Sequence, residues 1–133
     1  MRNLVLAALV IASASAFSES QTVNMFCGVN TYNMDGSDFK PLLGRDFDLA
    51  LGKRSPLLNT ANVFYSVIPK INTQGKEPRF SLFVEIQDAK TGTTISAAET
   101  EWTVGAPGAH QVSVYSSVAE PGIKTMLWCS FHK

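Results

Sequence analysis

FSLFVEIQ, residues 80 to 87, is the stretch that decides the fold class of this 133-residue chain. Its even positions are all large and apolar, whereas three of its four odd positions, Ser81, Glu85 and Gln87, are polar. A period of two is typical of a β-strand that buries one face. Turn-forming residues follow at 88–92, and residues 93–104 return to an extended, β-branched pattern. Residues 80–104 therefore predict a β-hairpin.

Further strands are expected on both sides of this hairpin, separated by clusters of Gly, Pro, Asn and Asp. No window of ten or more residues shows a convincing helical period, so we expect at most a helical turn, near Pro41–Gly44 or Pro56–Thr60. The sequence thus predicts an all-β domain, a single antiparallel β-sandwich of about seven strands. The other expected strands are 22–29, 46–51, 62–68, 110–118 and 124–132.

The N-terminus has the composition of a secretory signal peptide. One basic residue, Arg2, precedes nine apolar residues at 4–12, and Ala14-x-Ala16 fits a cleavage site before Phe17, with Ala12-x-Ala14 as the nearest competitor. An uncleaved anchor is the alternative, but crossing a bilayer takes about 20 apolar residues. We therefore expect a signal peptide at 1–16, a single domain at 17–133 without a membrane span, and a secreted or periplasmic location.

The charge balance argues against nucleic acid as a partner. Without Arg2 the chain keeps 10 basic and 11 acidic residues, and its densest basic stretch, residues 70–79, is interrupted by Glu77. Strong attraction to nucleic acid or to anionic lipid needs a basic surplus or a basic patch. Neither is present in the sequence.

Cys27 and Cys129 are the only cysteines, and export would take them to a compartment where disulfides persist. Strand parity points both side chains inward, so we predict a disulfide between the first and last strands. Closing a loop of about 100 residues is worth about 4–5 kcal/mol in the chain-entropy model. A zinc site shared with His110 and His132 is the alternative, but the usual paired ligand spacing is absent.

Two sets of residues are candidates for catalysis, the histidines and two pairs of acidic residues. His110 and His132 are the only histidines, and the chain has no G-x-S-x-G turn to place a serine beside either one. The acid pairs Asp46/Asp48 and Glu99/Glu101 have a spacing that overlaps the carboxylate separation of glycosidases, but alternating acids are also typical of a solvated strand face. A small extracellular hydrolase acting on a cell-wall or extracellular polymer is therefore the alternative function.

The connection from Asn30 to Arg45 is the strongest binding candidate in the sequence. It exceeds what a simple hairpin needs, and loops on a rigid β scaffold commonly carry recognition. It places apolar anchors beside hydrogen-bonding groups, and we select as binding residues Tyr32, Met34, Asp35, Asp38 and Phe39.

The same segment supplies oxygen ligands around Gly36 but departs from an EF-hand at Thr31 and Leu42. We expect no cofactor, and the segment leaves open only an irregular, weak calcium site. The alternative is that these side chains form turns with their own backbone.

Two aromatic residues, Phe83 and Trp128, fall by parity on the outer faces of their strands, where they could belong to a binding platform. Coverage of these rings by sheet curvature or by a loop is the alternative. Taken together, the sequence favours an exported, non-catalytic binding or structural module, a class that includes enzyme inhibitors and surface-interaction proteins. Its expected partner is a protein or a carbohydrate.

Overall fold

The computed structural model describes residues 21–106 and 110–131. The predicted signal peptide and its cleavage site lie outside the described residues. Within them the chain forms strands and turns without a helix, and all strand pairs are antiparallel. The eight strands are β1 (Thr22–Asn33), β2 (Lys40–Ala50), β3 (Ser55–Asn59), β4 (Val63–Asn72), β5 (Arg79–Asp88), β6 (Thr94–Thr103), β7 (His110–Glu120) and β8 (Ile123–Phe131).

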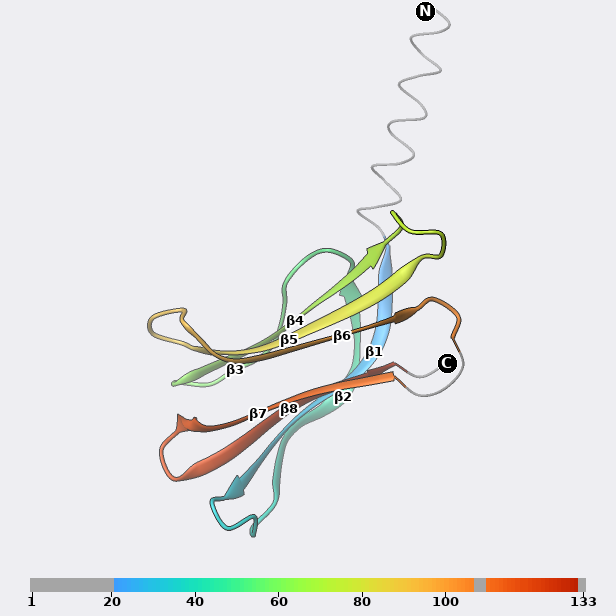
Figure 1. The fold of residues 1–133 in the computed structure, drawn as a ribbon. Coiled ribbons are helices and arrows are strands. Elements are labelled where there is room, and N and C mark those ends of the chain that lie inside the picture. Colours follow the sequence, from blue (N-terminus) through green and yellow to red (C-terminus); the bar gives the residue numbers. More distant parts are fainter. Residues whose placement is uncertain (1–20, 107–109, 132–133) are drawn as a thin grey trace, which may run out of the picture.

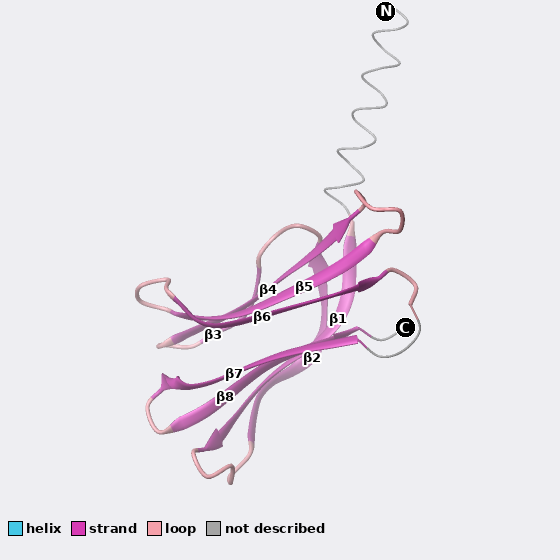
Figure 2. Ribbon diagram, viewed as in Figure 1, coloured by secondary structure: helices cyan, strands magenta, loops and turns pink. Residues whose placement is uncertain are grey.

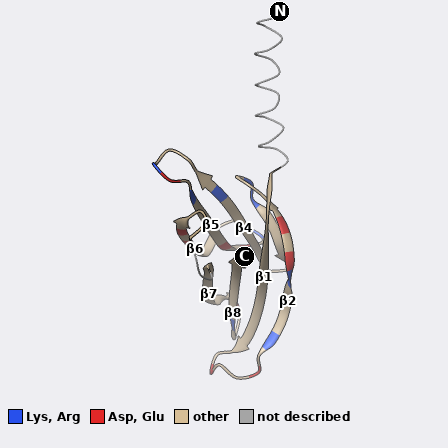
Figure 3. Ribbon diagram, turned by 90° about the vertical axis from the view of Figure 1, so that its right-hand side faces the viewer, with Lys and Arg blue, Asp and Glu red and all other residues tan. Residues whose placement is uncertain are grey.

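The strands form two four-stranded sheets that face each other, with the orders β2-β1-β8-β7 and β3-β4-β5-β6 (Figures 1 and 2). The predicted β-sandwich is confirmed, and so is the hairpin from which it was argued, because β5 pairs with β6 from Arg79↔Thr103 to Gln87↔Thr94. Basic and acidic residues are interspersed along the strands and loops rather than gathered in one region (Figure 3).

The strand count was one too low because β3 was read as part of a loop. Pro56 and its turn-forming neighbours suggested a helical turn at Pro56–Thr60, and that prediction was wrong. Proline cannot donate a ladder hydrogen bond, but an edge strand needs ladder bonds on one side only. β3 is an edge strand that pairs with β4 alone, so Pro56 is accommodated there.

The first hairpin is also longer than predicted. β1 extends to Asn33 and β2 begins at Lys40, so the helical turn expected at Pro41–Gly44 is strand, and the connection between β1 and β2 spans only residues 34–39. The polar residues at 30–33, predicted to lie in a loop, are ladder positions. All four pair with β8, and Asn30 and Thr31 also pair with β2.

The core lies between the two sheets and is built by alternation along each strand. In β5 the residues Leu82, Val84 and Ile86 are fully buried, as the period of two predicted. Opposite them, β1 and β8 contribute Met25, Val29 and Leu127, also buried.

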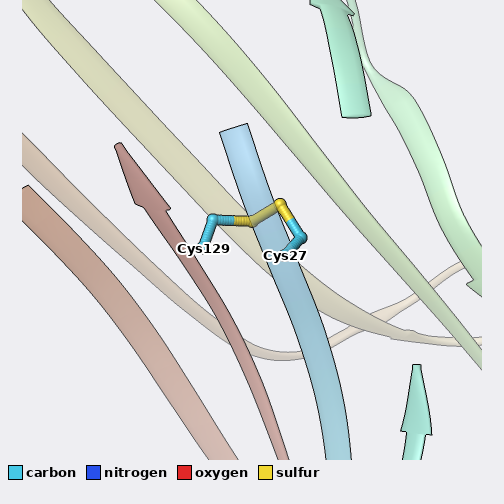
Figure 4. Close-up of a disulfide and its surroundings, with 2 residues drawn as sticks. All are labelled: Cys27 and Cys129. Atoms are coloured by element: carbon cyan, nitrogen blue, oxygen red, sulfur yellow. A yellow bond between two sulfur atoms is a disulfide. The ribbon is translucent and has the colours of Figure 1, made fainter. Parts of the chain in front are cut away.

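The predicted Cys27–Cys129 disulfide is present and fully buried in this core. The two cysteines lie directly opposite each other on β1 and β8, which are neighbours in the same sheet (Figure 4). The bond therefore joins the first strand to the last, across 102 positions of sequence, without crossing between the sheets.

Candidate binding pocket

One end of the sandwich contains an apolar pocket of about 240 Å³. Antiparallel pairing brings alternate strand ends together here: β1, β5 and β7 begin, while β2, β4, β6 and β8 end. We call this cavity the end pocket. Its main lining side chains are Leu51, Ile71, Phe80, Trp102, His110 and Phe131.

Four rings from both sheets build the wall of the end pocket. The imidazole of His110 stacks on the Trp102 indole, with ring centroids 4.6 Å apart and planes 9° apart. Phe131 meets the Trp102 ring edge to face at 83° and the Phe80 ring at 85°. Stacked and edge-to-face pairs are the favoured aromatic geometries, so the rings support one another.

The polar side chains of the described lining are few, namely Gln21, Thr22 and His110. Gln21 and Thr22 contribute at the start of β1, and the described lining includes no Asp, Glu, Lys or Arg. His110 Nε2 lies 3.3 Å from the carbonyl oxygen of Ala106, which ties the start of β7 to the segment after β6. A pocket of this kind is suited to an apolar group that carries at most one or two hydrogen-bonding atoms.

The mouth of the pocket continues as exposed apolar surface. Val104 is 46% exposed and Ile71 is 38% exposed, and both also line the pocket. Exposed aliphatic side chains at the rim of a concave apolar site are typical of a contact surface rather than of a sealed core.

The binding residues predicted from sequence lie at the opposite end of sheet β2-β1-β8-β7, on and beside the turn at 34–39. Phe39 packs on Tyr32 with ring centroids 5.4 Å apart, and Tyr32 and Asp38 line a hollow of about 230 Å³ whose lining is more polar than that of the end pocket. Met34 is exposed on the turn, away from the lining of that hollow. The long loop that motivated this selection is absent, and a binding role for these five residues stays a prediction.

Asp35 has a structural part in that turn. Its carboxylate accepts hydrogen bonds from the Ser37 hydroxyl at 2.5 Å and from the Ser37 backbone N–H at 2.8 Å. These bonds hold the pKa of Asp35 below its ordinary value of 3.8. The described residues contain no group of three or more His, Cys, Asp or Glu side chains placed to share a metal ion, so the calcium reading gains no support.

The acid pairs considered for catalysis face solvent. Asp46, Asp48, Glu99 and Glu101 are all exposed, and none of them lines the end pocket. Asp48 accepts a hydrogen bond from the Asn24 amide at 3.0 Å, and Glu101 is ion-paired with Arg79 at 2.6 Å. These contacts are those of carboxylates on solvated strand faces.

Phe83 and Trp128 do not form one platform, because they belong to different sheets. Phe83 is half-buried on β5, and Trp128 on β8 packs against Phe26 with ring centroids 5.3 Å apart. A Cβ atom added at Gly28 would lie 2.7 Å from the Trp128 ring nitrogen. Trp128 therefore lies close against the backbone of β1.

The end pocket was missed in the sequence because its walls are core positions of separate strands. Phe80 and Trp102 were assigned to a half-buried hairpin, and Phe131 to the last strand, but nothing in the sequence says which strand ends meet. The sequence did offer one clue, because Phe80 lies at the start of its strand whereas Trp102 and Phe131 lie at the ends of theirs. In antiparallel strands such positions can meet at one end of the sandwich.

Comparison with protein-family models, with curated proteins and with solved structures finds no similar chain. In the part of the chain that the structure describes, no helix has the length and apolar character needed to cross a bilayer.

Proposed function

We propose that this protein is an exported, non-catalytic binding module that receives an apolar group of its ligand in the end pocket. The observation that carries the proposal is the pocket itself, a concave apolar site between the sheets with an uncovered aliphatic rim. A concave pocket lined mainly by apolar and aromatic side chains, with a few polar groups, is the usual form of a small-molecule site.

Export is supported by the signal-like N-terminus and by the buried disulfide, since such bonds persist mainly in oxidising compartments. Intact-mass measurement of the exported protein tests this part. A chain that begins at Phe17 and weighs about 2 Da less than its reduced form is expected for the single disulfide. A chain that still begins at Met1 contradicts it.

A non-catalytic role is supported by the surroundings of the candidate catalytic groups. His110 contacts an indole ring and a backbone carbonyl, and the acid pairs lie on solvated faces, while His132 lies outside the described residues. Neither arrangement places a base beside a nucleophile. Turnover of an extracellular polymer that Asp46→Asn or Glu99→Gln abolishes would contradict this role.

The test of binding uses two matched valine substitutions. Val104→Glu puts a charge on the pocket rim, whereas Val118→Glu makes the same change on a side chain 78% exposed outside the pocket lining. Wild type and both variants are used to recover bound molecules from the native exported fraction, and these are identified by mass spectrometry. We expect a molecule that wild type and Val118→Glu retain and Val104→Glu loses. Equal retention by all three proteins contradicts binding at the pocket.

A further inference from the structure

We infer that the end pocket selects a neutral aromatic group of one or two rings. The inference rests on the proposed function, because it names the ligand class of the same site. It depends on three features of the pocket: its volume, the orientation of the rings in its wall and the absence of Asp, Glu, Lys and Arg from its described lining.

The volume sets the size of the group. An apolar cavity of about 150 Å³ holds a benzene molecule, whereas drug-sized ligands occupy sites of about 300–1,000 Å³. At about 240 Å³ the end pocket falls between these limits. One ring, or two fused rings, fits that space.

The wall geometry favours an aromatic group over an aliphatic one. Phe131 stands at 85° to Phe80 and at 83° to Trp102, so the rings of the wall lie in nearly perpendicular planes. An aromatic ring that enters parallel to one wall ring is therefore edge-on to another, and stacked or edge-to-face pairs add about 0.5–1.5 kcal/mol beyond the area that they bury. A saturated ring of the same size gains burial only.

The lining also restricts charge. A carboxylate or an ammonium group in this pocket would lose its hydration without meeting an opposite formal charge among the described Asp, Glu, Lys and Arg residues. Gln21, Thr22 and His110 can serve one hydroxyl or ring N–H instead. Phenol and indole rings carry a group of that kind.

The same ring could reach the pocket as a free small molecule or as an aromatic side chain of a polypeptide. The apolar rim formed by Ile71 and Val104 lies outside the ring-sized space and is available to the rest of a larger ligand. The experiment below therefore includes a free-ring arm and a peptide arm.

The test follows the indole N–H resonances of the two tryptophans in the ¹⁵N-labelled protein. Trp102 lines the pocket. Trp128 belongs to the other sheet, where it packs against Phe26, and it serves as an internal control. Trp128→Phe assigns the two signals. The probes are p-cresol, its saturated counterpart 4-methylcyclohexanol, indole, and a capped Gly-Trp-Gly peptide.

We expect p-cresol and indole to shift the Trp102 resonance and leave that of Trp128 in place, with p-cresol bound about fivefold more tightly than 4-methylcyclohexanol. If the peptide binds at least as tightly as indole, the natural ligand is an aromatic side chain of a polypeptide. If only indole binds, the natural ligand is a small molecule. Both results retain the aromatic class. Equal affinity for p-cresol and 4-methylcyclohexanol overturns the aromatic class while apolar binding stands. No shift of Trp102 with any probe contradicts the proposed function as well.

Discussion

The hydroxyl of Tyr65 on β4 lies 3.0 Å from the hydroxyl of Thr125 on β8, joining the two sheets through the middle of the core. Thr125 is 3.3 Å from the carbonyl oxygen of Asn30, to which its hydroxyl donates. That hydroxyl carries one proton, so Tyr65 is the donor in the bond between the sheets. Both side chains are fully buried, and the chain of bonds satisfies their polar atoms inside an apolar layer.

Replacing Tyr65 with Phe removes this donor but leaves the Thr125 hydroxyl its bond to Asn30. We expect the free energy of unfolding to fall by about 1 kcal/mol, the net value of one such hydrogen bond. Urea unfolding measures the change, with Tyr115→Phe as the control because that ring is 57% exposed. A Tyr65→Phe protein as stable as wild type would show that the bond between the sheets adds nothing.

Tyr65 also predicts how stability changes in alkali. Burial raises the pKa of Tyr65 above its ordinary value of 10.0, and the nearby Glu120 carboxylate adds to the shift. The unfolded chain therefore releases this proton at a lower pH than the folded one, so stability falls as pH rises above about 10. Wild type should lose more stability than Tyr65→Phe between pH 9 and pH 11 (about one unit either side of the ordinary value). Parallel losses in urea unfolding contradict the assignment.

A second prediction concerns the ion pair between Arg54 and Glu85. Glu85 faces outward from the sheet but is only 4% exposed, because the Arg54 side chain covers it in an ion pair. The same Arg54 nitrogen also donates to the Ser66 hydroxyl at 2.8 Å. Thr94 donates to the other carboxylate oxygen. The carboxylate is thus covered by its own partners.

Arg54→Met leaves this buried carboxylate without its cation, so we expect a loss of about 3 kcal/mol, near the low end for a buried pair because Arg54 is itself 40% exposed. Adding Glu85→Met removes the unpaired charge and should recover part of the loss. A double-mutant cycle in urea measures both steps. Additive losses would mean that the two side chains do not stabilise each other.

Gly28 and Gly44 form a matched pair for a third prediction, since they face each other across β1 and β2. A Cβ atom at Gly28 would lie 2.7 Å from the Trp128 ring nitrogen, whereas one at Gly44 would lie at an ordinary 3.7 Å from Phe26. We expect Gly28→Ala to displace the indole and cost about 1–3 kcal/mol. Gly44→Ala should cost clearly less, and the Trp128 resonance should move only in the first variant. Equal effects of the two substitutions would show that the indole does not require a glycine beneath it.

The disulfide gives a fourth prediction. The double variant Cys27→Ala/Cys129→Ala should lose about 4–5 kcal/mol, because the bond closes a loop of about 100 residues in the unfolded chain. Alkylation of the denatured, unreduced wild-type protein should add no label. Two labels per chain would show that the thiols are free.

The sequence predicted most of the scaffold because that scaffold depends on local pattern. The alternation from Phe80 to Gln87 set the face of β5 toward the core, and parity in the first and last strands placed Cys27 and Cys129 inward, where the structure has them. β3 was missed because edge position, which tolerates Pro56, is a property of the sheet and not of five residues taken alone.

The end pocket could not be predicted in the same way. It exists because β6 and β7, the edge strands of different sheets, bring Trp102 and His110 together, and because Phe131 reaches them from β8. Pairing order across the sandwich is long-range information that periodicity does not carry. The exposed residues at 34–39 drew attention instead because their mixture of apolar and polar types is visible within one short segment.

The central claim is that an apolar group binds in the end pocket, and calorimetric titration of the protein with p-cresol at two temperatures tests it most directly. The account predicts one site per chain, a negative change in heat capacity from apolar burial, affinity reduced about fivefold or more by Val104→Glu, and affinity unchanged by Val118→Glu. Absence of saturable binding, or equal weakening by both glutamate substitutions, would contradict it.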